Sequence, residues 1–217
     1  MPKSVFFRLP ALIFVASVIA ACQTAGGSST GTKILQPGAP GQETRTISTA
    51  QATDLSKVQA TTADVTFMQG MIGHHAQAVE MVALVNDRTA NPSMKMLGLR
   101  IQVSQEDEMD MMRKWLAERG AAVPGPHAHH ESGGFMPGML TSEEMAALAA
   151  AKGVEFDRLF LQGMIKHHGG AITMVEELFK SPGAGQEGAI FAFASDVDAD
   201  QRMEIDRMGM MLREIME

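Results

Sequence analysis

Two histidine pairs in nearly identical surroundings are the residues of this chain best suited to chemistry. The segment FMQGMIGHHAQAVEMV spans residues 67–82, and FLQGMIKHHGGAITMV follows at residues 160–175. A methionine precedes each pair by one helical turn, the spacing that makes side chains neighbours on a helix. Another methionine follows about two turns after each pair begins. The candidate metal ligands are therefore Met71, His74, His75, Met81, Met164, His167, His168 and Met174.

The donor atoms of these segments suit a soft metal ion. Thioether and imidazole without thiolate favour copper, Cu(I) first and Cu(II) as the alternative. The chain has one cysteine, Cys22, which excludes a thiolate cage, and zinc normally takes Cys or carboxylate ligands beside His. The competing interpretation is structural, because Met also fills irregular cores. A buried His is likewise often only a hydrogen-bonded core residue.

A second His-rich tract lies between the two segments. His127, His129 and His130 are followed by Met136 and Met139 in a stretch rich in Gly and Pro. Short His-rich tracts often bind metal. We expect a weaker, more exposed secondary site here, or else a polar loop without metal.

The elements that carry these residues are expected to be helices. Apolar residues recur at helical spacing, and no segment shows sustained period-two alternation, so we expect no strands. Residues 105–116 also resemble residues 201–212, so the repeat extends to a second helix of each pair. The prediction is an all-α, four-helix bundle of two repeated helix pairs. The expected helices are 61–86, 93–119, a short 142–151, 153–180 and 186–216, with a linker at 121–140.

Helical geometry separates the two histidines of each pair. At 100° per residue, His75 shares a face with Met71 and points into the bundle, whereas His74 lies on the flank. By the repeat, His168 is expected inward and His167 on the flank. Adjacent histidines are therefore not expected to chelate one ion together.

Two acidic residues occupy matching positions in the repeat. Glu108 and Glu204 are expected to hydrogen-bond a histidine from behind its metal-binding side. A di-iron carboxylate site is not favoured, because that chemistry needs Glu three residues before His and no His here has it. We expect no catalytic residue, because no Ser, His and acid set is indicated by spacing.

The N-terminus has the form of an export signal. Lys3 and Arg8 precede a short apolar run that ends in small residues at Cys22. Residues 1–22 are interpreted as a signal peptide with a bacterial lipobox, Cys22 being the lipid-modified residue; cleavage at a nearby site without lipid is the alternative. Residues 23–54 are expected to form a flexible tether, and residues 55–217 the folded metal-binding domain. Formal net charge is −7, which disfavours nucleic acid and leaves a lipid anchor as the only membrane attachment.

The quoted segments resemble the His-His-x-x-Ala-x-x-Met signature of a ferritin-like family, the domain of unknown function number 305. The match runs over about residues 60–217 and includes Glu108, Met112 and Trp115-Leu116. The resemblance implies a ferritin-like bundle in exported bacterial proteins, some of which bind copper through Met and His in the periplasm. It also implies the eight ligands named above. The second copy departs from the pattern, with Met211 in place of Trp115 and with Gly169-Gly170, which is expected to loosen its helix.

These observations predict an exported, lipid-anchored bundle that sequesters or buffers copper ions and is not an enzyme. Two alternatives stay open. One is a redox-active, metal-dependent enzyme of ferritin-like fold, and the other is a structural bundle without metal whose partner is an envelope protein.

Overall fold

The computed structural model describes residues 34–36, 44–54, 58–125 and 136–217, in two units that divide between Asp54 and Leu55. In the first unit β1 (Ile34–Gln36) pairs antiparallel with β2 (Arg45–Ile47), and α1 (Thr49–Ala52) follows. The expectation of no strands is therefore wrong at these positions. Each strand has three residues, too few for a period of two to be recognised.

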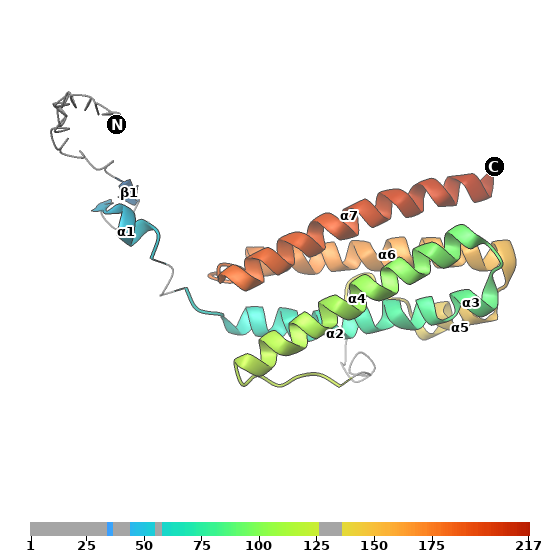
Figure 1. The fold of residues 1–217 in the computed structure, drawn as a ribbon, viewed down its shortest axis with the longest axis horizontal. Coiled ribbons are helices and arrows are strands. Elements are labelled where there is room, and N and C mark those ends of the chain that lie inside the picture. Colours follow the sequence, from blue (N-terminus) through green and yellow to red (C-terminus); the bar gives the residue numbers. More distant parts are fainter. Residues whose placement is uncertain (1–33, 37–43, 55–57, 126–135) are drawn as a thin grey trace, which may run out of the picture. The chain divides into compact units, whose positions relative to one another are not determined.

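The second unit is helical throughout its regular elements (Figure 1). Its four long helices form a bundle, which confirms the all-α, ferritin-like prediction. The expected helix 61–86 is interrupted at Leu84. No helix in the described ranges is both long and apolar enough to cross a membrane. The elements are α2 (Thr62–Ala83), α3 (Val85–Arg88), α4 (Pro92–Glu118), α5 (Ser142–Ala150), α6 (Gly153–Lys180) and α7 (Gly188–Met216).

The bundle consists of two helix hairpins that meet through one helix of each. α2 packs on α4, α6 packs on α7, and α2 contacts α6. Asp64, near the start of α2, accepts a 2.7 Å hydrogen bond from Gly185 N, beyond the end of α6. Asp157 stands 93 positions later, near the start of α6, and accepts one of 3.3 Å from Asn91 Nδ2, just before α4. α2 and α6 are therefore antiparallel, and the sequence repeat becomes an approximate twofold symmetry.

Local hydrogen bonds fix where the helices begin. Thr61 and Asp64 form a capping box at α2, and Thr141 and Glu144 form another at α5. Each box satisfies two backbone N–H groups that the first helical turn leaves without a partner. The short α5 is thereby held as a defined element close to α6, which it contacts.

Two apolar clusters fill the interior, and a polar layer lies between them along the helices. The first cluster includes Met71, Met112 and Met174; the second includes Met81 and Met164. On each long helix, buried polar residues stand between the segments that feed the two clusters. This polar layer consists of the buried residues His74, His75, Gln77, Gln105, His167, His168, Gln201 and Glu204, together with the partly buried Glu108.

Candidate metal centre

All four histidines of the repeated segments are buried in the polar layer. The rings of His74 and His167 lie against each other where α2 meets α6, with centroids 3.8 Å apart and ring planes tilted by 36°, and each side chain is at most 1% exposed. The expectation that these two lie on the flank is wrong. A single-helix wheel cannot show that α6 covers that side of α2. The inward position of His75 and His168 is confirmed, since both are fully buried.

Every imidazole is oriented through its Nε2 atom. His74 Nε2 lies 2.9 Å from Pro137 O, and His167 Nε2 lies 2.8 Å from His74 O. Backbone and carboxylate oxygens only accept hydrogen bonds, so each Nε2 carries the proton and donates it. The other two bonds are His75 Nε2 to Glu108 Oε2 at 2.5 Å and His168 Nε2 to Glu204 Oε2 at 2.7 Å.

The Nδ1 atoms of the same four rings are buried and have no hydrogen-bond partner within the described structure. In a neutral imidazole protonated at Nε2, Nδ1 holds a lone pair and is the metal-binding atom. A buried acceptor without a partner costs about 1–3 kcal/mol. The carboxamide oxygens of Gln105 and Gln201 in this layer also lack partners. The layer therefore contains polar atoms that protein groups leave unsatisfied.

Burial keeps the central pair of histidines neutral. The pKa of His74 falls to about 3, first because its surroundings desolvate the charged form and then because His75 repels it. Burial also lowers the pKa of His167 well below its usual value, with repulsion from His74 next. Both rings are therefore neutral at neutral pH, with Nδ1 free of a proton, which is the state a metal ligand requires.

The carboxylates behind the histidines match the prediction made from the repeat. Glu108 and Glu204 each hydrogen-bond a histidine Nε2, which is the arrangement that orients metal-binding imidazoles. Arg100 Nε lies 3.4 Å from Glu204 Oε1. Burial raises the pKa of Asp200, as do the nearby carboxylates of Glu108 and Glu204. Negative charge thus concentrates between α4 and α7.

The structure pairs the predicted methionines across α2 and α6 and not within each repeated segment. A methyl group in place of a Gly70 hydrogen would lie 3.4 Å from Met174 Cε, and one at Gly163 would lie 3.2 Å from Met81 Cε. Each distal methionine therefore reaches across to the opposite helix. Met71 and Met174 share the first apolar cluster, and Met81 and Met164 share the second. We call Met71 and Met174 the groove pair, and Met81 and Met164 the covered pair.

The end of the linker, residues 136–140, crosses the bundle at the level of the histidines; we call it the strap. A methyl group at Gly170 would lie 1.9 Å from Pro137 O, and one at Gly138 would lie 2.5 Å from Lys166 O. Gly138 also has φ of 75°, which favours glycine. Two glycines thus permit direct backbone contact between the strap and α6.

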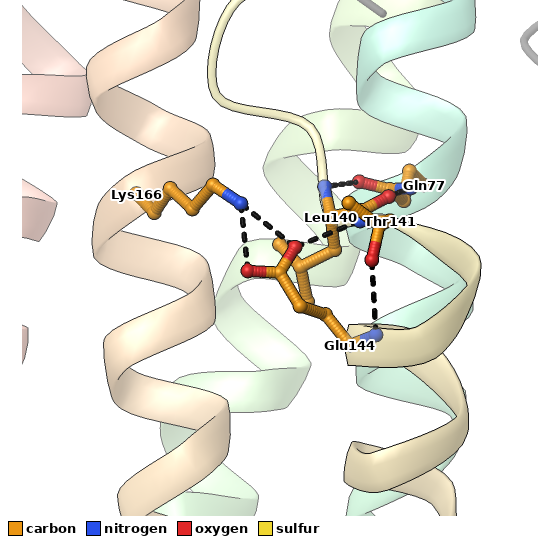
Figure 2. A network of polar contacts seen from close by, with 5 residues as sticks. All are labelled: Gln77, Leu140, Thr141, Glu144 and Lys166. Carbon is orange, nitrogen blue, oxygen red and sulfur yellow. Dashed lines mark hydrogen bonds and ion pairs between the residues drawn. The ribbon is translucent and has the colours of Figure 1, made fainter.

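The far end of the strap is held by Gln77 on α2. Its side-chain amide donates to Leu140 O at 2.9 Å and accepts from Leu140 N at 2.8 Å. Figure 2 shows this clamp beside Thr141 and Glu144, whose carboxylate reaches Lys166 on α6. Sequence reasoning missed Gln77, although Gln at that position and Gly at position 170 are a visible break in the repeat.

The structure describes only some of the remaining predicted residues. Met139 is only 7% exposed, so it is not in an exposed tract as expected, and Met136 is partly buried against the first apolar cluster. His127, His129 and His130 lie outside the described residues, as does Cys22. Gly169-Gly170 does not loosen its helix, because α6 runs without a break from Gly153 to Lys180. Among described residues, no group of three or more His, Cys, Asp or Glu side chains is placed to hold a metal ion.

Known proteins are similar to this chain in fold and in sequence. A DUF305 protein of Streptomyces coelicolor, predicted to be secreted, is 31% identical with a TM-score of 0.62, over 70% of this chain and 93% of that one. A DUF305 fragment from Deinococcus radiodurans is 30% identical with a TM-score of 0.63, over 71% and 98%. CopM in a Cu(II)-bound form is 27% identical with a TM-score of 0.58, over 70% and 96%. CopM has also been solved in an Ag-bound form.

A curated relative, an uncharacterised protein of Acanthamoeba polyphaga mimivirus, is 36% identical over 63 residues. These residues are 29% of this chain and 41% of that protein, so the match spans less than half of the relative's length. Residues 64–212 match the family described as domain of unknown function DUF305. This range holds nearly all of both helix hairpins, the strap and the entire polar layer, and the chain belongs to the DUF305 family.

Proposed function

We propose that this protein binds copper, as Cu(I) in preference to Cu(II), and sequesters or buffers it without catalysing a reaction. The observation that carries the proposal is the set of four buried Nδ1 atoms without partners. Each belongs to an imidazole whose Nε2 is already committed to a carboxylate or a carbonyl. Such rings present an unprotonated nitrogen to a metal and cost no reorientation when it binds.

The methionines supply the remaining donors. Met71 and Met164 stand one turn before their histidine pairs and are fully buried, as is Met81, while Met174 is 9% exposed. Thioethers bind metal without losing a proton, and they select soft ions such as Cu(I). The comparisons support the choice of metal, since the related CopM has been solved with copper and with silver.

A competition titration tests the proposal. The purified protein and a variant with Met71→Leu and Met164→Leu are titrated with Cu(I) against bathocuproine disulfonate without oxygen. We expect Cu(I) binding in the protein and a loss of affinity of about tenfold or more in the variant, because leucine preserves volume but removes sulfur. Binding that is absent, or equal in the two proteins, contradicts the proposal.

Exposed methionines provide the matched control. Met96 on α4 is 69% exposed and Met210 on α7 is 52% exposed, so a variant with Met96→Leu and Met210→Leu removes the same number of thioethers from the surface. Its Cu(I) affinity should equal that of the unaltered protein. A loss equal to that of the buried double variant would mean that surface thioethers bind the metal.

We further propose that the protein works outside the cytoplasm, attached by lipid at Cys22. The motif that ends at this cysteine motivates the proposal. Palmitate labelling of cells that express the protein or Cys22→Ala tests it. Label in the unaltered protein alone is expected, and equal labelling of both would refute it.

A further inference from the structure

The groove pair of methionines reaches the surface through Met174, whereas Met71 is fully buried. A groove of about 510 Å³ opens over Met174, Gly70, Met136 and Pro137. It lies between the start of α2 and the end of α6, with one end of the strap as a wall. Met174 is 9% exposed, whereas its counterpart Met81 has no exposure. The approximate twofold symmetry therefore does not extend to access.

The covered pair is closed by hydrocarbon and by a short helix. A methyl group at Gly163 would lie 3.0 Å from Leu140 Cδ2, and Leu140 is 4% exposed. α5 lies on this side, tied by Lys166 Nζ to both Glu144 oxygens at 2.8 and 2.7 Å (Figure 2). The hollow here measures about 220 Å³, and no methionine lines it.

The two ends of the strap thus place different side chains beside Gly70 and Gly163, which occupy equivalent positions in the repeat. At Gly70, a methyl group would meet Met136 Sδ at 3.6 Å as well as Met174 Cε. At Gly163, the residue in the corresponding place is Leu140. Sulfur lines the open side, whereas at the closed side the strap places the hydrocarbon side chain of Leu140 against the glycine. A soft ion entering the groove would find two thioethers before it reached Met71.

We propose that the two methionine pairs are inequivalent: the groove pair exchanges Cu(I) with the surroundings, with Met136 as its outermost ligand, and the covered pair retains Cu(I). This inference rests on the proposed copper binding. His74 belongs with the groove pair, because its Nε2 is anchored on Pro137 O, in the groove wall next to Met136.

The rate of Cu(I) release tests the proposal. The copper-saturated protein is mixed with excess bathocuproine disulfonate, and the transfer of Cu(I) to the chelator is monitored by stopped flow. Two phases are expected. Met136→Leu should accelerate the fast phase about tenfold, the scale on which loss of a supporting group weakens a metal site, and leave the slow phase unchanged. Lys166→Ala should accelerate only the slow phase, by up to about fivefold, since one surface ion pair is lost.

Met145→Leu is the matched control. Met145 is also partly buried, but it packs on α5 against the second cluster, so both phases should be unchanged. Circular dichroism checks that the variants fold. A single phase in the unaltered protein, or a fast phase that Met136→Leu does not change, overturns this inference and leaves copper binding intact. Failure to retain Cu(I) at all overturns the proposed function instead.

Discussion

Two adjacent glycines of α6 provide a sharp test of the strap. Gly169 and Gly170 lie in the same helix, and alanine stabilises a helix interior by about 0.5–1 kcal/mol relative to glycine. A methyl group at Gly169 would meet nothing within 4 Å. One at Gly170 would lie 1.9 Å from Pro137 O and 2.7 Å from Gly138 Cα. Backbone atoms cannot move aside as a side-chain tip can, so the strap must shift.

The size of the expected loss of stability follows from the contacts that are lost when the strap shifts. His74 Nε2 loses its bond to Pro137 O, which costs about 1–3 kcal/mol for a buried group left unpaired. Overpacking adds about 1–3 kcal/mol. After the gain in helix propensity, Gly170→Ala should destabilise the protein by about 2–4 kcal/mol, whereas Gly169→Ala should stabilise it slightly.

Urea unfolding, monitored by circular dichroism, measures both variants against the unaltered protein. Metal-free protein is used, so that any change in copper affinity does not enter the comparison. A Gly170→Ala variant as stable as Gly169→Ala would refute the close contact between strap and helix.

Three further predictions concern the polar layer. Glu108→Gln should weaken Cu(I) binding about 10- to 100-fold in a chelator competition, because the carboxylate behind His75 is lost. The control Glu106→Gln alters an exposed hydrogen bond to Gln102 and should leave Cu(I) binding unchanged. Gln77→Ala should lower the free energy of unfolding by about 2–4 kcal/mol, since both backbone groups of Leu140 lose their partner. The control Gln102→Ala should lower the free energy of unfolding by less than about 0.5 kcal/mol in the same urea assay. The metal-free protein should lose stability as pH falls below 6.5, because His74 and His167, whose pKa values are lowered in the folded state, take up protons there only when the protein unfolds. Each histidine contributes up to about 1.4 kcal/mol to this loss between pH 7.5 and 5.5. A stability profile by urea titration that is flat over this range would contradict the assignment.

The helices could be predicted because their signals are local. Apolar spacing identifies each long helix, and helix-breaking residues lie close to observed boundaries: Gly183 is three positions after the end of α6, and Pro92 is the first residue of α4. The repeat also predicted that Glu108 and Glu204 would stand behind histidines, because matching positions in a duplicated hairpin have matching neighbours. These inferences needed only one helix, or one hairpin, at a time.

The grouping of ligands could not be predicted in this way. Met81 belongs with Met164, and Met174 with Met71, only because α2 and α6 are antiparallel and cross at the histidines. A helical wheel also assigns His74 to the flank, since it contains no second helix to cover that side. Both errors arise from contacts between elements, on which local spacing carries no information.

Position 77 shows why a duplicated sequence cannot stay symmetric here. Its counterpart 93 residues later is position 170, and the two hold Gln and Gly. The strap joins the hairpins once, so only one copy of each contact to it can exist. Gln77 uses a side chain to hold the strap at Leu140, and Gly170 omits one to let Pro137 approach. The same asymmetry places Met136 over one methionine pair and Leu140 over the other. A single connection thereby gives the two related methionine pairs different access to the outside, and the repeat diverges where the strap touches it.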